Sequence, residues 1–213
     1  PPPGRALVMP DPAALNARRA VGRIPEDVRP DLRWYTVAEH RPSVGEIDVD
    51  VVVHDHAGPA GTWARTARPG DVAGFRSGGA LYSTWDAQRQ LIVADETAVP
   101  ALLAILEERF RRGLPGLGEG IEAHVEVGSR VVLDGLDLPA AVTVHERGDA
   151  APGTAVLAAL ATAPDLTADL DYAWLCGESG LATSLRRHLV QEIGMDKRAI
   201  TFSGYWKLGA ARG

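Results

Sequence analysis

The chain has 213 residues, of which 46% are apolar, and its formal net charge at pH 7 is −6. This length suits one large domain or two small ones, and the negative charge argues against a general nucleic-acid binder. No apolar run approaches the roughly 20 residues that a membrane-spanning helix needs. Cys176 is the only cysteine, so no disulfide can form within the chain, and we expect a reducing, cytoplasmic environment.

Residues 1–88 are predicted to form a connector followed by β-structure. Prolines recur through the first 32 residues and prevent long regular elements, so we expect only a helical turn near residues 13–20. Farther along, apolar and polar residues alternate over 46–54, as is typical of a half-buried strand, and turn residues stand at Pro42–Gly45. The predicted elements are strands over 33–39, 46–54 and 72–76, and a short helix over 62–67.

From residue 89 onwards the pattern changes to alternating strands and helices, which predicts a parallel sheet with helices on both faces. In the first helix, Leu102, Leu103, Leu106 and Phe110 would share one buried face. We therefore divide the chain into a β domain over 1–88 and an α/β domain over 89–213. The expected strands of the second domain are 91–94, 121–127, 141–145, 172–176 and 199–203, and its expected helices are 99–111, 153–163 and 181–193.

Two polar segments follow strands of the predicted sheet, at the edge where open α/β sheets bind ligands. Asp95–Ala98 follows the first strand and opens the first helix. Asp95 or Thr97 could cap this helix, or the free N–H groups at its start could face a phosphate or a nicotinamide amide. Glu178 follows a later strand through Gly177, and helix capping explains this carboxylate as well as ligand binding does.

A further candidate site lies on the first predicted strand, over residues 33–39. Arg33 could pair with a pyrophosphate, Tyr35 could stack on a flat ring, and Thr36 could hydrogen-bond to that ring. An exposed arginine and a cross-strand aromatic pair would explain the segment equally well. His54 ends the next strand and would lie near this site if the two strands form a hairpin, although a structural role for this histidine is the simpler interpretation.

Tyr205 and Trp206 stand near the last residue and must pack either on the core or on a flat cofactor ring. The sequence contains no Gly-x-Gly-x-x-Gly, Walker A or Gly-x-Ser-x-Gly motif, and no Cys/His cluster has the spacing of zinc ligands. Nothing in the sequence therefore points to a metal site or to a nucleophilic catalyst.

Taken together, these segments resemble the siderophore-interacting proteins, flavin-dependent ferric-siderophore reductases of the ferredoxin-reductase superfamily. The resemblance runs from about residue 30 to the end, and its most specific parts are the segments at 95–101 and 204–206. The matching residues are Arg33–Val37, His54, Gly58–Ala60, Trp63–Ala64, Pro69–Asp71, Asp95–Ala101, Trp174, Gly177–Glu178, Leu185–Leu189, Gly204–Trp206 and Gly209.

The resemblance implies an FAD-binding antiparallel β-barrel followed by a ferredoxin-reductase-like, NAD(P)-binding α/β domain with a parallel sheet. It implies that Arg33 faces the FAD pyrophosphate, and that Tyr35 and Thr36, in a segment that includes Val37, face the isoalloxazine. The residues implied for the phosphates and adenine side of FAD are His54, Ala60, Thr62 and Trp63. Those implied near the flavin and the nicotinamide are Asp95, Thr97, Ala98 and Glu178, and Tyr205 and Trp206 would help to close the site.

The chain departs from the family pattern in two respects. The family motif Arg-x-Tyr-Thr-x-Arg ends in a second arginine, and Ala38 stands at that position here. The family also has barrel strands before the first residue of this sequence, so we expect an N-terminally incomplete barrel with open edges. Both departures favour an alternative in which the chain is a non-catalytic siderophore- or flavin-binding homologue.

The resemblance implies a reaction in which NAD(P)H reduces FAD, and reduced FAD reduces Fe(III) in a siderophore so that Fe(II) is released. This chemistry belongs to the cofactor, so we expect no catalytic acid or base. A general flavin reductase is a further alternative. The expected partner is a ferric siderophore, often anionic, bound by a monomer through local basic residues, for which the candidates are Arg65, Arg68, Arg76 and Lys207.

The identity of the electron donor is open between NADH, NADPH and a ferredoxin. Glu126 ends the second strand of the α/β domain, where an acidic residue favours a free ribose hydroxyl and hence NADH. Arg130 lies nearby and would favour the phosphate of NADPH. We expect a slight preference for NADH.

Overall fold

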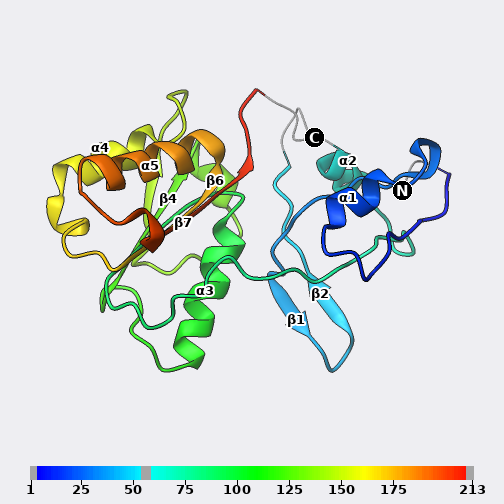
Figure 1. Ribbon diagram of the computed structural model, residues 1–213, viewed down its shortest axis with the longest axis horizontal. Coiled ribbons are helices and arrows are strands. Elements are labelled where there is room, and N and C mark those ends of the chain that lie inside the picture. The colour runs from blue at the N-terminus through cyan, green and yellow to red at the C-terminus, as the bar shows by residue number, and fades with distance from the viewer. Residues whose placement is uncertain (1–3, 54–58, 210–213) are drawn as a thin grey trace. The chain divides into compact units, whose positions relative to one another are not determined.

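The computed structural model of the chain describes residues 4–53 and 59–209. The chain forms two compact units, one of residues 1–35 and 53–79 and the other of residues 36–52 and 80–213. The helices are α1 (Ala17–Gly22), α2 (Pro59–Thr66), α3 (Val99–Arg111), α4 (Thr154–Thr162) and α5 (Ser179–Gln191), with 3₁₀ turns η1 (Glu26–Val28), η2 (Arg130–Leu133), η3 (Pro164–Leu166) and η4 (Lys197–Ala199). The strands are β1 (Glu39–Arg41), β2 (Glu46–Asp48), β3 (Gln90–Asp95), β4 (Ile121–Val127), β5 (Thr143–Glu146), β6 (Tyr172–Glu178) and β7 (Ile200–Trp206) (Figure 1).

The first unit contains the short helices α1 and α2 and the 3₁₀ turn η1. The side chain of Asn16 caps α1 by accepting a hydrogen bond of 2.9 Å from the N–H of Arg19. Helix α2 begins three residues before the predicted start at Thr62. The strand predicted over 72–76 is wrong, because this stretch pairs with no other described residues and a strand needs a hydrogen-bonded neighbour.

A short antiparallel hairpin in the second unit is held by charged side chains. In it, β1 and β2 pair with His40 opposite Ile47, and the connecting turn falls at residues 42–45 as predicted. The guanidinium of Arg41 contacts the carboxylates of Asp48 at 2.6 Å and Glu46 at 3.2 Å. The strand predicted over 33–39 is wrong except for its last residue, because the partner strand β2 extends only far enough to pair from residue 39.

The main body of the second unit is a five-stranded parallel sheet in the order β5-β4-β3-β6-β7. The parallel sheet and the helices on both of its faces agree with the prediction (Figure 1). The chain leaves β3 toward β4 on one side and later returns to β6 on the other, so the strand order reverses between β3 and β6. Such a reversal is the switch point outside which open α/β sheets bind ligands.

Two apolar layers cover the sheet. On one face, Ile92 and Ala94 of β3 pack with α3, and on the other face Leu91 and Val93 pack with α4 and α5. All four of these side chains have zero exposure, which explains why β3 is a continuous apolar run rather than an alternating one. No helix among the described residues combines the length and the apolar character needed to cross a membrane.

The prediction for α3 has correct ends and an inner face that is right for Leu102, Leu103 and Leu106 but wrong for Phe110. The helix spans Val99–Arg111 as expected, yet Phe110 is 84% exposed, while Leu102 and Ile105 are buried. Arg109 is buried instead, because its guanidinium donates to the Tyr82 hydroxyl at 2.9 Å and to the carbonyls of residues 85 and 115. These polar partners lie outside the helix, and Tyr82 and Trp85 are more than 20 residues away in sequence, so helical periodicity alone does not identify Arg109 as a core residue.

Gly177 in β6 has a backbone conformation and a neighbour that both require glycine. Its φ is +139°, and a Cβ placed on it would lie 2.5 Å from Cγ of Asp95. A side chain at this position would strain the backbone and displace the carboxylate of Asp95 from the switch point.

We predict that Gly177→Ala lowers the free energy of unfolding by at least about 2 kcal/mol, measured from urea unfolding curves. Gly116→Ala is the control, because a Cβ at Gly116 meets no atom within 4 Å. A Gly177→Ala protein as stable as this control would contradict the contact between residue 177 and Asp95.

Candidate functional site

The carboxylate of Asp95 lies at the switch point and joins three parts of the sheet. Its Oδ1 accepts hydrogen bonds from the N–H (2.9 Å) and the hydroxyl (2.6 Å) of Thr97. Its Oδ2 accepts from the N–H of Glu178 and from the indole Nε1 of Trp206, both at 2.7 Å. Asp95 is 3% exposed, and burial raises the pKa of its carboxyl, although these four donors oppose that shift.

This arrangement corrects the predicted capping of α3. The N-cap of α3 is Ala98, and its side chain makes no capping hydrogen bond. Neither Asp95 nor Thr97 caps the helix, because Asp95 is bound to residues of β6 and β7 and Thr97 is bound to Asp95. The sequence could not distinguish a local cap from these long-range partners.

The carboxylate of Glu178 caps α5 and also fixes the chain beyond β7. One oxygen accepts from the N–H groups of Gly180 and Leu181, as the capping interpretation predicted. The other oxygen accepts from the N–H of Leu208 at 3.0 Å. Both oxygens of this buried carboxylate therefore hold structure in place.

Tyr205 and Trp206 are neighbours on β7, and their side chains have different surroundings. Trp206 reaches Asp95, while Tyr205 packs against the core on the α3 side of the sheet and interacts with Cys176. Cys176 has zero exposure, and burial raises the pKa of its thiol to about 12, so it is a packing residue. Of the two predicted aromatic contacts, the structure brings Trp206 into a hydrogen bond with Asp95 at the switch point.

Both carboxylate oxygens of Glu126, at the end of β4, also accept hydrogen bonds within the fold. Its carboxylate accepts from the N–H groups of Gly153, Ala155 (2.9 Å) and Val156 (3.0 Å), so it caps α4 from a distant strand. The guanidinium of Arg147 lies 4.0 Å from it. Because no acceptor of Glu126 is left unbound, a preference for NADH stays a prediction without support from this residue.

The carboxyl edge of the sheet forms a narrow hollow with no room for a water molecule, which we call the switch-point cleft. It is lined by side chains from β3, β4, β6, β7, α5 and the loops after β3 and β5, namely Asp95, Glu96, Glu126, Arg147, Pro152, Glu178, Leu181 and Trp206. Four carboxylates and one guanidinium thus share it.

Glu96 differs from the other three carboxylates of the switch-point cleft. Among the described residues, the only hydrogen bond to its carboxylate comes from its own backbone N–H. Burial first, and then the negative charge of Asp95, raise the pKa of Glu96 to about 7. Its charge therefore changes near neutral pH, unlike that of an ordinary glutamate.

The starts of helices α3, α4 and α5 differ in whether a side chain caps them. Glu126 caps α4 and Glu178 caps α5, but no side chain among the described residues accepts a hydrogen bond from the first turn of α3. There the backbone N–H of Val99 has no acceptor in the described part of the chain, and Pro100 has no backbone N–H to donate. The start of α3 is thus the one of the three without a side-chain cap, and it is covered by packing, since Ala98 and Val99 have zero exposure.

In the first unit, the residues assigned to FAD offer open recognition groups. Tyr35 is 47% exposed and Trp63, on α2, is 44% exposed. Arg33 is partly exposed, with its guanidinium near the carboxylate of Asp31. Two half-exposed aromatic rings and a guanidinium fit the flat rings and the pyrophosphate of FAD.

The remaining predicted FAD contacts are placed as follows. Ala60 and Thr62 lie on α2, and Thr36 and Val37 are half-buried residues of the second unit, just before β1. His54 lies outside the described residues.

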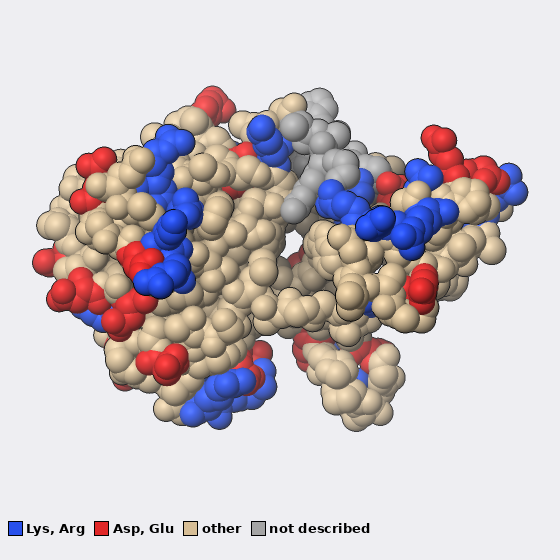
Figure 2. Space-filling model, viewed as in Figure 1, with Lys and Arg blue, Asp and Glu red and all other residues tan. Residues whose placement is uncertain are grey.

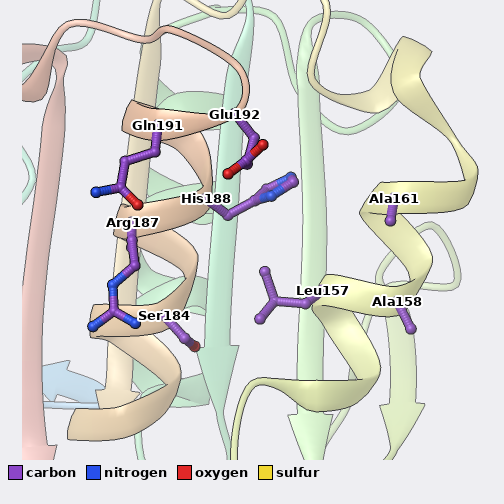
Figure 3. Close-up of a pocket in the computed structure, with 8 residues that line it drawn as sticks. All are labelled: Leu157, Ala158, Ala161, Ser184, Arg187, His188, Gln191 and Glu192. Atoms are coloured by element: carbon purple, nitrogen blue, oxygen red, sulfur yellow. The ribbon is translucent and has the colours of Figure 1, made fainter.

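A second hollow in the α/β unit shares no residue with the switch-point cleft. It is an open groove of about 450 Å³ between α4 and α5, with Leu157, Ala158 and Ala161 on one side and the polar residues Ser184, Arg187, His188, Gln191 and Glu192 on the other (Figure 3). None of the predicted site residues lines it. It is a groove between the outer surfaces of two packed helices, away from the strand ends that bind ligands in such sheets.

Charged side chains of both signs are interspersed on the face of the α/β unit that Figure 2 shows. The overall charge of −6 is therefore not gathered into one acidic field on this face. An anionic ligand would meet local rather than general repulsion there.

Comparison with known proteins assigns both parts of the chain. The family model described as siderophore-interacting protein matches residues 87–209, and the one described as siderophore-interacting FAD-binding domain matches residues 1–80. The chain belongs to the siderophore-interacting protein family. The predicted resemblance and the predicted fold class, an FAD-binding domain followed by a parallel-sheet α/β domain, are both confirmed.

The chain matches different shares of the length of its named relatives. The chain is 32% identical over 195 residues to the mycobactin import ATP-binding/permease protein IrtA of Mycolicibacterium smegmatis. This match covers 85% of the chain but only 20% of IrtA. It is 25% identical over 201 residues to the ferric acinetobactin reductase of Acinetobacter baumannii, covering 92% of the chain and 67% of that protein. The solved siderophore-interacting protein of Acinetobacter baumannii is 25% identical, with a TM-score of 0.67 over 90% of this chain and 76% of that one.

Two charged residues of the switch-point cleft, Glu96 and Arg147, were missing from the predicted site, as were the apolar residues Pro152 and Leu181. Glu96 stands inside the family segment at 95–101, but capping arguments directed attention to its neighbours Asp95 and Thr97. Arg147 directly follows β5, so its place at the carboxyl edge of the sheet was available from the strand prediction over 141–145. The signal in each case was the position just after a strand of the parallel sheet.

We predict that Trp206→Phe lowers the free energy of unfolding by about 1–2 kcal/mol, because it removes one hydrogen bond to the buried Asp95 and keeps an aromatic ring. Chemical denaturation measures this difference. Trp34→Phe is the matched control, since Trp34 is 56% exposed, and we expect a change below about 0.5 kcal/mol. Equal effects at the two positions would refute a stabilising role for the Trp206–Asp95 bond.

The raised pKa of Glu96 also predicts a pH dependence of stability. Between the ordinary value of 4.5 and about 7, the folded chain keeps a proton that the unfolded chain has lost, so stability falls as pH rises through this window. Glu96→Gln should remove this contribution and exceed the wild-type stability above pH 7, by at most about 3 kcal/mol. Unfolding curves across this pH range test the prediction, and identical slopes for the two proteins would contradict it.

Proposed function

We propose that this chain acts as a ferric-siderophore reductase that uses FAD and NAD(P)H to release iron as Fe(II). The observation that carries the proposal is the combination, in one chain, of an FAD-binding domain with a parallel sheet whose strand order reverses at a switch point. The similarity to a ferric acinetobactin reductase over 92% of the chain supports the same substrate class.

FAD, when bound, supplies acceptance of a hydride from the nicotinamide and delivery of single electrons to Fe(III). The protein's part is to hold the groups in reach of one another. We assign Arg33 to the FAD pyrophosphate and Tyr35 to the isoalloxazine, because one offers a guanidinium and the other a half-exposed ring. Other assigned FAD contacts are Thr36, Val37, His54, Ala60, Thr62 and Trp63.

The dinucleotide donor is assigned to the carboxyl edge of the sheet. Thr97 and Ala98 would lie near the nicotinamide, while Asp95, Glu178 and Trp206 hold the surrounding chain in place. Tyr205 supports this edge from the core side of β7. We divide the two roles between residues 1–88 and 89–213, and assign the activity to a monomer in the cytoplasm.

The siderophore would be recognised by exposed basic side chains. Arg68 and Lys207 are exposed, and Arg76 has one guanidinium nitrogen 2.7 Å from the carbonyl of Ala14. With Arg65, these residues are our candidates for an anionic ferric chelate. Fe(II) binds hard oxygen donors more weakly than Fe(III), so reduction itself releases the metal.

We predict that the purified chain gains a bound-flavin spectrum on addition of FAD and then reduces a ferric siderophore with NADH or NADPH. Fe(II) is trapped by a coloured ferrous chelator. Tyr35→Ala should weaken FAD binding about 10-fold or more, through loss of ring stacking, while Tyr172→Phe, in the buried core of β6, should not.

The rival function is a binding homologue without turnover, and Ala38 in place of the second motif arginine favours it. A chain that takes up no flavin at saturating FAD would favour this rival. Turnover of free flavin without preference for ferric chelates would instead favour a general flavin reductase.

A further inference from the structure

We propose that the buried histidine pair His124–His145 is an acid-sensitive lock that holds the edge strand β5 on the sheet. The lock is closed while both imidazole rings are neutral, and it opens when the surrounding solution is acidified. The inference is independent of the proposed function, because neither histidine is assigned to FAD, to the dinucleotide donor or to the siderophore.

The two imidazole rings join β4 directly to β5. Nδ1 of His124 lies 2.8 Å from Nε2 of His145, and the rings are stacked with their centroids 5.1 Å apart. His145 stands opposite Glu126 in the register of the two parallel strands, so the bond to His124 runs diagonally between them. A hydrogen bond between two imidazoles needs one N–H donor and one lone pair, so at least one of the rings must be neutral.

His124 lies where a positive charge is unfavourable. Its side chain is 2% exposed, and its Nε2 is buried without a hydrogen-bond partner among the described residues. Val93 of β3 stands beside it, and helix α4, which packs on both strands, has only apolar and hydroxyl side chains. On the same face of β4, Glu122 lies two residues before His124 and Glu126 two residues after it. Burial first, and then the charge of His145, lower the pKa of His124 to about 4.

Charged groups from two neighbouring elements act on His145 in opposite directions. Glu126 of β4 favours the charged imidazole, while Arg130 of η2 disfavours it. Both oxygens of Glu126 are already bound at the start of α4, and Arg147 lies 4.0 Å from this carboxylate. Burial has the largest effect and lowers the pKa of His145 from its ordinary value of 6.5. Both rings therefore resist protonation as long as the two strands stay together.

Strand β5 depends on this bond because few other contacts hold it. It is an edge strand of four residues that pairs with β4 alone, and its first and last residues are exposed. Val144 packs on the α3 side of the sheet, and His145 makes the contact on the other side. The strand leads into Arg147, whose N–H donates to the carbonyl of Val127 at 3.0 Å. Opening the lock therefore releases β5 together with Arg147.

Acid opens the lock because protonation is linked to opening. In an opened strand the histidines have the ordinary value of 6.5, so below this pH the open form binds protons that the closed pair does not. The stability of the closed strand is thus present above about pH 6.5 and is lost as the pH falls toward about 4. This direction is opposite to the one predicted for Glu96, so the measurement must be confined to β5.

The test is hydrogen exchange at the Arg147 amide, followed by nuclear magnetic resonance at pH 7 and pH 5 and corrected for intrinsic exchange rates. We expect its protection factor to fall about 10-fold or more, because an ordinary histidine at pH 5 is charged about 30 times more often than neutral. The amides of the central strand β6 should stay better protected than Arg147 at pH 5, since only the edge strand opens.

The double variant His124→Asn/His145→Gln removes the titration but can keep a hydrogen bond. The amide groups of Asn and Gln lie close to the positions of Nδ1 and Nε2 of the two rings, so one amide can donate to the other. Protection of Arg147 in this variant should change less than about 3-fold between pH 7 and pH 5. His40→Gln is the matched control, because His40 is exposed in the β1–β2 hairpin, and this variant should behave as the wild type does.

The imidazole nitrogen resonances of the wild type give a second test that needs no substitution. His124 should remain neutral at pH 5 in molecules whose Arg147 amide is protected. A charged His124 beside a protected Arg147 amide would overturn the lock. So would wild-type protection that is the same at both pH values, a fall of equal size in the double variant, or equal protection of Arg147 and β6 at pH 5.

Discussion

The hydrogen bonds to the Asp95 carboxylate are the interaction on which the carboxyl edge of the sheet depends. This single group connects β3 to the backbone of β6 and to the indole of β7, across the point where the strand order reverses. The Asp95 carboxylate lies so close to the backbone of β6 that position 177 must be glycine. The same carboxylate binds the N–H of Thr97, where the chain turns away from β3. A ligand site at a switch point needs fixed walls, and here a buried carboxylate with four donors provides them.

The acidic character of this edge follows from how the helices are capped. Glu126 and Glu178 each satisfy the start of a helix that packs on the same face of the sheet, so two negative charges are brought to the cleft by structural needs. On the opposite face, α3 receives no such carboxylate. The start of α3 is instead closed by packing, since Ala98 and Val99 have zero exposure.

The α/β unit was predictable from sequence because its signals are local. The spacing of apolar residues gives Val99–Arg111 and Ile121–Val127 with correct ends, and continuous apolar runs identify β3 and β6 as buried strands. The strands predicted over 33–39 and 72–76 failed because a strand exists only with its partner, which periodicity does not reveal. The same reason applies to the site. That Asp95 would bind Trp206, 111 residues away, rather than cap α3 depends on tertiary contacts.

The end of β7 is where these constraints meet. As an edge strand, β7 pairs with β6 alone, and the ends of such strands are usually among the first parts of a sheet to open. Two buried acids counter this tendency, since Asp95 holds Trp206 and Glu178 holds the N–H of Leu208. Both anchors act through groups whose loss would leave a buried carboxylate short of a donor, which is more unfavourable than losing a hydrogen bond at the surface. The last described residues of the chain are therefore held at the carboxyl edge of the sheet by two buried acids, one on β3 and one at the end of β6.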